Sequence, residues 1–248
     1  MESNEYTLNY LDLLVQRPWF SRDDLRTAMT HCGLNISTAN FKVKLQKLLE
    51  RGIVARTGRN AYYVPQEGIA EYRYDYSAQS TQIADRIGEQ YPYLDFVIFE
   101  LIQCNEFVNH QLAHNAIFVD VDGDAADFVF DTLKEAYPGK VLLNPTIEEY
   151  YKYWYDDMII VRRLISEAPK NKKIKWQSRL EKVLVDLLAD NLLQGILSPA
   201  ELPAIYEDAF RKYVIDESSL FRYAKRRGAE KKIRQFITEK TNVMLRLG

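Results

Sequence analysis

Apolar residues recur at the spacing of an α-helix through the first fifty residues of the chain, and polar residues mark where each helix starts. The pattern predicts helices over residues 7–16, 21–33 and 37–52. Ser21 and Asp24 are placed as in a capping box at the start of the second helix. The beginning of the chain is therefore predicted to hold three short helices.

Two β-prone runs follow the third helix and predict a hairpin. They lie within residues 53–64, IVARTGRNAYYV, on either side of a turn at Thr57-Gly58-Arg59-Asn60. Three helices followed by a hairpin is the order of a winged helix-turn-helix, and LLERGIVARTGRNAYYV resembles the third helix and wing of that family. We therefore expect residues 1–66 to be a winged helix-turn-helix domain.

The outward face of the predicted third helix and the tip of the hairpin carry the polar residues that such a domain uses on DNA. Lys and Arg neutralise phosphates, whereas Asn and Thr near the start of the helix reach base edges in the major groove. The residues expected to contact double-stranded DNA are Thr38, Asn40, Lys42, Lys44, Lys47, Arg51, Arg56, Arg59 and Asn60. The alternative is that these are solvated charges on a module that binds protein.

Helical and strand-like patterns alternate beyond the hairpin, so we expect a mixed α+β protein. Residues 67–80 are predicted to be a linker with a short strand, and residues 81–248 an α/β domain with helices in its C-terminal part. The apolar runs DFVIFELI, NAIFVDV, KVLLN and DMIIVRRLI predict strands. A short helix is expected at residues 105–111, and Asp124 is expected to cap the next one. From about residue 178 the chain is predicted to be almost wholly helical.

Charge separates the chain into three parts although the total is only −2. Residues 1–66 carry 9 basic and 6 acidic side chains, residues 67–168 carry 7 and 19, and residues 169–248 carry 17 and 10. The resulting net charges of +3, −12 and +7 indicate different partners for different parts. The sequence shows no membrane span, no signal peptide and no CxxC spacing for its two cysteines, so we expect a cytoplasmic protein.

Several runs beyond the hairpin are similar to one known family. The sequences FELIQCNEFVNHQ, AIFVDVDGDAADFVFDTLKE, VLLNP, LEKVLVDLLAD and LFRYAKRRG resemble the C-terminal domain of the AbiEi family, the antitoxins of type IV (abortive infection) toxin–antitoxin pairs. The order of the two domains is also that of the family, and the resemblance covers nearly the whole chain.

The resemblance implies a bacterial antitoxin of phage defence. Its winged helix would repress its own operon, and its second domain would neutralise a nucleotidyltransferase-type toxin, directly or functionally. Because one module of net charge +3 binds DNA weakly, two copies on one operator are expected, while the oligomeric state stays open. The positions that match the family signature are Asn105, Glu106, Phe107, His110, Glu181, Lys182, Asp186, Tyr223, Ala224, Lys225, Arg226 and Arg227.

Asp120, Asp122 and Asp124 form a carboxylate cluster that would suit Mg²⁺ or Ca²⁺, which makes a metal-dependent nuclease or nucleotide-handling enzyme the main alternative. The cluster fails the EF-hand spacing, and the Gly-Ser turn that precedes the metal pair of nucleotidyltransferases is absent. No D/E-x-K follows Asp95, Glu100 and Asp120, as a nuclease of that type would require. The sequence therefore favours a chain without catalysis, metal or cofactor.

Other residues of chemical interest lack the neighbours that chemistry needs. His110 and His114 are spaced for one helical face but have no third ligand, and Cys32 and Cys104 have no activating neighbour. The aromatic run at residues 150–155 favours packing or a protein interface over base stacking, given the negative charge around it. We predict a non-enzymatic DNA-binding antitoxin and autorepressor; a protein-interaction winged-helix subunit of a defence complex is the second alternative.

Overall fold

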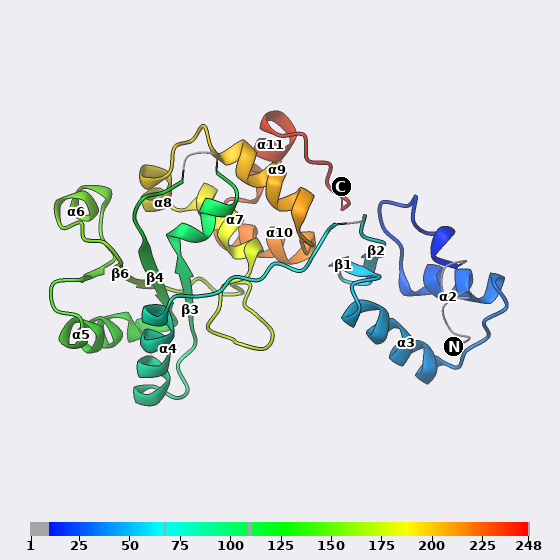
Figure 1. Cartoon of the computed structure of the whole chain (residues 1–248), viewed down its shortest axis with the longest axis horizontal. Helices are drawn as coiled ribbons and strands as arrows, with labels where there is room; N and C mark the ends of the chain where they lie inside the picture. The colour runs from blue at the N-terminus through cyan, green and yellow to red at the C-terminus, as the bar shows by residue number, and fades with distance from the viewer. Residues whose placement is uncertain (1–9, 67, 109–110, 248) are drawn as a thin grey trace. The chain divides into compact units, whose positions relative to one another are not determined.

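The chain folds as a mixed α+β protein with two compact units. The computed structural model describes residues 10–66, 68–108 and 111–247. Unit 1 comprises Met1–Tyr72, Phe210–Ser219 and Met244–Gly248, and unit 2 comprises Arg73–Ala209 and Leu220–Val243. Each unit thus combines segments that are far apart in the sequence, and both contain helices and strands (Figure 1).

The elements at the start of unit 1 follow the sequence pattern closely. At the predicted capping box, Ser21 Oγ accepts from the Asp24 N–H at 3.1 Å, and the Asp24 carboxylate accepts from the Ser21 N–H at 2.8 Å. The next helix starts after Ser37, whose hydroxyl oxygen accepts from its first turn. The elements are α2 (Arg22–His31), α3 (Thr38–Glu50), β1 (Ala55–Gly58) and β2 (Ala61–Tyr63).

A single apolar core holds these elements together. It gathers the inward faces of α2 and α3, residues of the hairpin and the segment around residues 10–14, of which 10–12 are helical. Phe20 pairs with the hairpin as a strand residue would, because its backbone exchanges two hydrogen bonds with that of Tyr62 in β2, at 2.7 and 2.9 Å. The predicted helices that start after residues 21 and 37 and the predicted hairpin are confirmed. Of the helix predicted at 7–16, residues 7–9 lie outside the described part of the chain, residues 10–12 are helical, and residues 13–16 form a turn instead of continuing the helix.

A late segment of the chain, residues 244–247, completes unit 1. The buried carboxylate of Glu217 accepts from the backbone N–H groups of Arg246 at 2.9 Å and Leu247 at 2.7 Å. The Arg246 guanidinium lies 3.9 Å from the centre of the Tyr63 ring and donates to the Pro18 carbonyl. The hairpin is therefore held from one side by residues far from it in the sequence.

Unit 2 is built on a four-stranded sheet with the strand order β3-β4-β6-β5. β4 pairs in parallel with β6, and β5 also pairs in parallel with β6, whereas β3 is antiparallel to β4. The four strands correspond to the four apolar runs that predicted strands. They are β3 (Phe96–Glu100), β4 (Ala116–Val121), β5 (Val141–Leu143) and β6 (Met158–Arg163).

Helices pack on the sheet, and successive strand residues alternate between its two faces. On one face, α4 and α5 contribute Ile83, Ile87, Val129 and Leu133 to a core with every second strand residue. The opposite face presents Phe118, which stacks on Phe99, and the same face of β4 presents Asp120. The helices are α4 (Ala78–Gln90), α5 (Ala126–Ala136), α6 (Ile147–Lys152), α7 (Leu180–Ala189), α8 (Asn191–Ile196), α9 (Leu202–Lys212), α10 (Glu217–Arg226) and α11 (Glu230–Lys240), with 3-10 turns η1 (Leu101–Glu106) and η2 (Gly123–Ala125).

α7 is buried along its whole length. Every residue from Leu180 to Leu188 is buried, including Glu181, Lys182 and Asp186. A helix that is surrounded by protein on all sides is normally apolar all round, so charged residues within it require partners.

Four local predictions are wrong. The described residues of the 67–80 segment form no strand, and α4 begins at Ala78, within the predicted linker, because Ser77 caps it. The short helix lies at Leu101–Glu106 instead of 105–111. Asp124 caps no helix: η2 intervenes, and α5 starts without a side-chain cap.

The predicted C-terminal helical region is divided into five helices and ends at Lys240. Among the described residues, none of the helices combines the length and the hydropathy needed to span a bilayer.

Candidate functional site

The residues predicted to contact DNA lie along α3 and the hairpin of unit 1. Asn40, Lys44, Lys47 and Arg51 follow one another at helical spacing, so they form one stripe along the helix. This stripe is exposed except at Lys44, which is half-buried with its ammonium 5.5 Å from the centre of the Tyr10 ring. Thr38 and Lys42 are also exposed.

The three hairpin residues differ in how free their side chains are. Arg56 is exposed, but its Nε donates to the Gly58 carbonyl at 2.9 Å. Asn60 adopts a left-handed backbone (φ 55°), and its side-chain oxygen accepts from the Arg22 N–H at the start of α2. Arg59 is exposed at the turn between them.

The family-signature positions fall into two groups, and the first lies around η1. The Asn105 side chain closes a loop by accepting from the Leu112 N–H at 2.7 Å and donating to its carbonyl at 3.1 Å. Phe107 is buried, and Glu106 is exposed at the end of η1. His110 lies outside the described residues.

The second group lies on α7, on α10 and at Arg227, the residue that follows α10. Glu181 is buried and forms an ion pair with Arg179 at 2.5 Å. Ala224 is buried, Lys225 is exposed and Arg226 pairs with Glu167. The other four positions of this group, Lys182, Asp186, Tyr223 and Arg227, meet in one network of charges.

The network begins on the sheet, where the parallel pairing places Asp120 of β4 opposite Arg162 of β6. The Arg162 guanidinium donates from Nε and Nη2 to the two carboxylate oxygens of Asp120, at 2.8 and 3.2 Å. Its Nη1 donates to Asp190 Oδ2 at 2.9 Å. A two-pronged contact of this kind fixes the guanidinium plane as well as its position.

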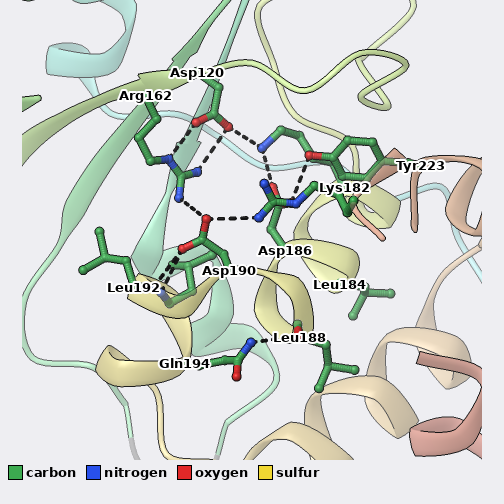
Figure 2. A network of polar contacts seen from close by, with 12 residues as sticks. Asp120, Arg162, Lys182, Leu184, Asp186, Leu188, Asp190, Leu192, Gln194 and Tyr223 are labelled. Atoms are coloured by element: carbon green, nitrogen blue, oxygen red, sulfur yellow. Dashed lines mark hydrogen bonds and ion pairs between the residues drawn. The ribbon is translucent and has the colours of Figure 1, made fainter. Parts of the chain in front are cut away.

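Lys182 forms the centre of the network (Figure 2). Its ammonium donates to Asp120 Oδ2 at 2.5 Å and to Asp186 Oδ2 at 2.6 Å, and only 1% of its side chain is exposed. Lys182 and Asp186 are four residues apart on α7, so both project from the same face of that helix.

α10 and the start of α8 complete the network. The Tyr223 hydroxyl donates to Asp186 Oδ1 at 2.9 Å. Arg227 lies 3.2 Å from Asp186 and donates to Asp190 at 3.1 Å. Asp190 also caps α8 by accepting from two of its backbone N–H groups. Three carboxylates and three cations therefore balance one another in the interior of unit 2.

Burial and charge act in opposite directions on the ionisation of these groups. Burial alone would raise the pKa of Asp120, but the charges of Arg162 and Lys182 outweigh it and hold that pKa below its usual value. Burial would lower the pKa of Lys182, and the carboxylates of Asp120 and Asp186 instead raise it well above its usual value. Both groups are therefore charged at neutral pH.

This arrangement bears on the alternative of metal-dependent catalysis. Both oxygens of Asp120 are taken by cations, whereas Asp122 is exposed beyond the end of β4. The two carboxylates do not form a pair of ligands. Over the described ranges of the chain, no three His, Cys, Asp or Glu side chains are grouped as metal ligands. His114 pairs with Asp156 at 3.7 Å.

The sequence indicates this network by charged residues that stand within apolar runs, although no local motif marks them. Asp120 and Arg162 interrupt the otherwise apolar strands AIFVDV and MIIVRR, and Lys182 and Asp186 interrupt the apolar helix LEKVLVDLLA. A charge in such a run requires an opposite charge nearby. The neighbouring carboxylates suggest a metal ligand at Asp120, and no local motif points to Arg162 or Asp190.

A family of unknown function, DUF6577, matches residues 40–243, which covers most of the chain and all the residues of the network. The chain belongs to this family. None of the curated proteins matches it. A solved structure with some likeness is the crystal structure of the Rv2827c protein from Mycobacterium tuberculosis. It is 10% identical, with 97% of this chain and 83% of that chain covered and a TM-score of 0.23, too low to relate the two folds.

The network predicts a strong dependence of stability on Lys182 in this DUF6577 protein. Lys182→Met keeps much of the side-chain volume but leaves Asp120 and Asp186 without their shared cation. Removing one partner of a buried ion pair costs about 3–5 kcal/mol. We expect that loss in the free energy of unfolding, measured by urea denaturation. Lys225→Met, on the exposed side of α10, serves as the control and should change it by less than about 0.5 kcal/mol. A similarly small loss for Lys182→Met would contradict the network.

The lowered pKa of Asp120 predicts a specific loss of stability in acid. A carboxylate with a lower pKa in the folded state stabilises the fold above its unfolded pKa of about 3.9, and this contribution disappears as the pH falls through the folded pKa. Asp120→Asn should therefore be less stable than the wild type at pH 7, and the difference should shrink as the pH falls from about 4 to 2. Urea denaturation across this range measures it, with the exposed Asp85→Asn on α4 as the control. A difference that is constant with pH would show that Asp120 is not ionised in the network.

Proposed function

We propose that this chain is a DNA-binding antitoxin and transcriptional autorepressor of the AbiEi type, with residues 1–66 acting as a winged helix-turn-helix. The observation that carries the DNA-binding half is the division of α3 into two faces. Phe41, Leu45 and Leu48 lie in the core of unit 1, while the stripe from Asn40 to Arg51 faces outward. A helix fixed by its apolar face and polar on its flank fits the recognition helix of such a domain.

The stripe supports a division of labour along α3. Thr38 and Asn40 lie at its N-terminal end, from which helix-turn-helix proteins reach base edges in the major groove. Lys47 and Arg51 lie further along and would contact phosphates, which position the helix without reading sequence. Arg59 at the turn of the hairpin would add a backbone contact. A protein bound in this way represses its operon by occupying the promoter.

The antitoxin half rests on the resemblance of the second domain to the AbiEi family. Four of the signature positions, Lys182, Asp186, Tyr223 and Arg227, belong to the network of unit 2. In that network every charge is neutralised by a fixed partner, as in a scaffold that holds a binding surface in shape. This supports a protein that counters a nucleotidyltransferase-type toxin by binding or by repression rather than by catalysis.

DNA affinity should depend on the cations of α3. We expect the full chain to bind its own upstream DNA in preference to scrambled DNA at about 100 mM salt. In Lys47→Ala with Arg51→Ala, the affinity should fall at least about 10-fold and the slope of log affinity against log salt should flatten by about 2, because each lost phosphate contact removes about 0.9. Fluorescence anisotropy measures both. The control replaces two exposed cations of unit 2, Arg86→Ala with Lys240→Ala.

The outcome of that titration also separates the alternatives. Unchanged affinity in the α3 variant would mean that the recognition helix is misplaced. The absence of any preference for its own DNA would favour a winged helix that contacts protein. Cleavage of the DNA in the presence of Mg²⁺ would favour the nuclease alternative.

Neutralisation of a toxin is predicted to survive the loss of DNA binding. Cells that express a nucleotidyltransferase encoded beside this gene should stop growing, and growth should return when this chain is co-expressed from an unrelated promoter. The variant with Lys47→Ala and Arg51→Ala should restore growth as well as the wild type does, since the second domain is unchanged. Growth arrest that persists with the wild-type chain would refute the antitoxin half of the proposal.

A further inference from the structure

A small pocket opens beside the charge network of unit 2. Its volume is about 150 Å³, and it is lined by residues of the network together with Asn144, Arg163 and Ile165. Pockets that enclose drug-sized ligands measure about 300–1,000 Å³, so this one has room for a single functional group rather than for a whole molecule of that size.

The pocket has more hydrogen-bond donors than its own carboxylates use. Every carboxylate oxygen of Asp120, Asp186 and Asp190 already accepts at least one hydrogen bond from within unit 2. The guanidinium groups of Arg162 and Arg227 have more N–H groups than these carboxylates occupy. The group that would complement the pocket is therefore rich in acceptors.

Arg163 gives the pocket an excess of positive charge. The three carboxylates balance Arg162, Lys182 and Arg227, so the charge of Arg163 is additional. Arg163 is an exposed residue at the end of β6 that lines the pocket, and among the residues that the structure describes it has neither an ion pair nor a hydrogen bond. Asn144 adds an exposed amide at the same rim.

We propose that this pocket binds a phosphate group, either inorganic phosphate or the phosphate of a phosphate monoester whose remaining part stays outside. Planar guanidinium groups are suited to the paired oxygens of a phosphate, and Arg163 and Arg227 line the pocket. The ion pairs with Asp186 and Asp190 hold Arg227 in place before the ligand arrives, and the unpaired Arg163 remains available to contact it. The proposal goes beyond the proposed function and does not depend on it, since it concerns unit 2 alone.

Binding by the full chain tests the proposal. Inorganic phosphate and adenosine monophosphate are titrated by calorimetry, with sodium chloride at matched ionic strength as the blank. We expect saturable binding, with an affinity that falls about 10-fold or more in Arg163→Gln, because an ionic hydrogen-bonded contact is lost. Arg86→Gln removes an exposed charge from α4 and should bind like the wild type. Neither exposed arginine supports the core, so both variants should unfold at the wild-type temperature.

A second variant, Asn144→Gly, tests the pocket without changing its net charge. Asn144 has a left-handed backbone (φ 44°), which glycine also adopts readily, so Asn144→Gly removes the amide without straining the chain. It should weaken phosphate binding while leaving the net charge unchanged. Tighter binding of the monophosphate than of phosphate would identify a monoester as the ligand, and equal binding would identify phosphate itself. No saturable binding up to about 10 mM, or equal affinities in Arg163→Gln and Arg86→Gln, would overturn the proposal.

Discussion

The interior position of Lys182 is the constraint on which unit 2 depends. Burying an ammonium without partners would cost more free energy than the net stability of a domain of this size, so the fold must place carboxylates beside it. Asp120 comes from a strand and Asp186 from the same helix as the lysine. These carboxylates in turn require Arg162, which belongs to a second strand, and Arg227, which directly follows α10. One buried charge thereby fixes the relative placement of two strands and two helices.

Local patterns predicted the parts of the fold that depend on neighbouring residues. The capping box at Ser21, the hairpin turn and the four strands follow from hydrogen bonds or alternation over a few positions. The cap at Asp124 failed because a 3-10 turn comes between the strand and the helix. The break in helical periodicity over the 67–80 segment suggested a linker with a short strand, but a strand also needs a neighbour to pair with, and that depends on tertiary structure.

The charge network could be predicted only in part, for a related reason. The signature positions on α7 and α10 were named from the resemblance, and the interruption of apolar runs by charges was visible in the sequence. The pairing of Asp120 with Arg162 depends on β4 and β6 being parallel neighbours in one particular register, although β5 lies between them in the sequence. No local spacing encodes that register, so Asp120 was interpreted with Asp122 and Asp124 instead.

The segment that completes unit 1 has a consequence for synthesis on the ribosome. Pro18 and Tyr63 are made early, yet they contact Arg246, which emerges only after the whole of unit 2 has been translated. At roughly 5–20 residues per second, the hairpin waits on the order of ten seconds or more for this contact. The residues of this unit that are translated first therefore reach their final packing late, and a nascent chain in which Arg246 has not yet been made carries an incomplete version of the proposed DNA-binding surface.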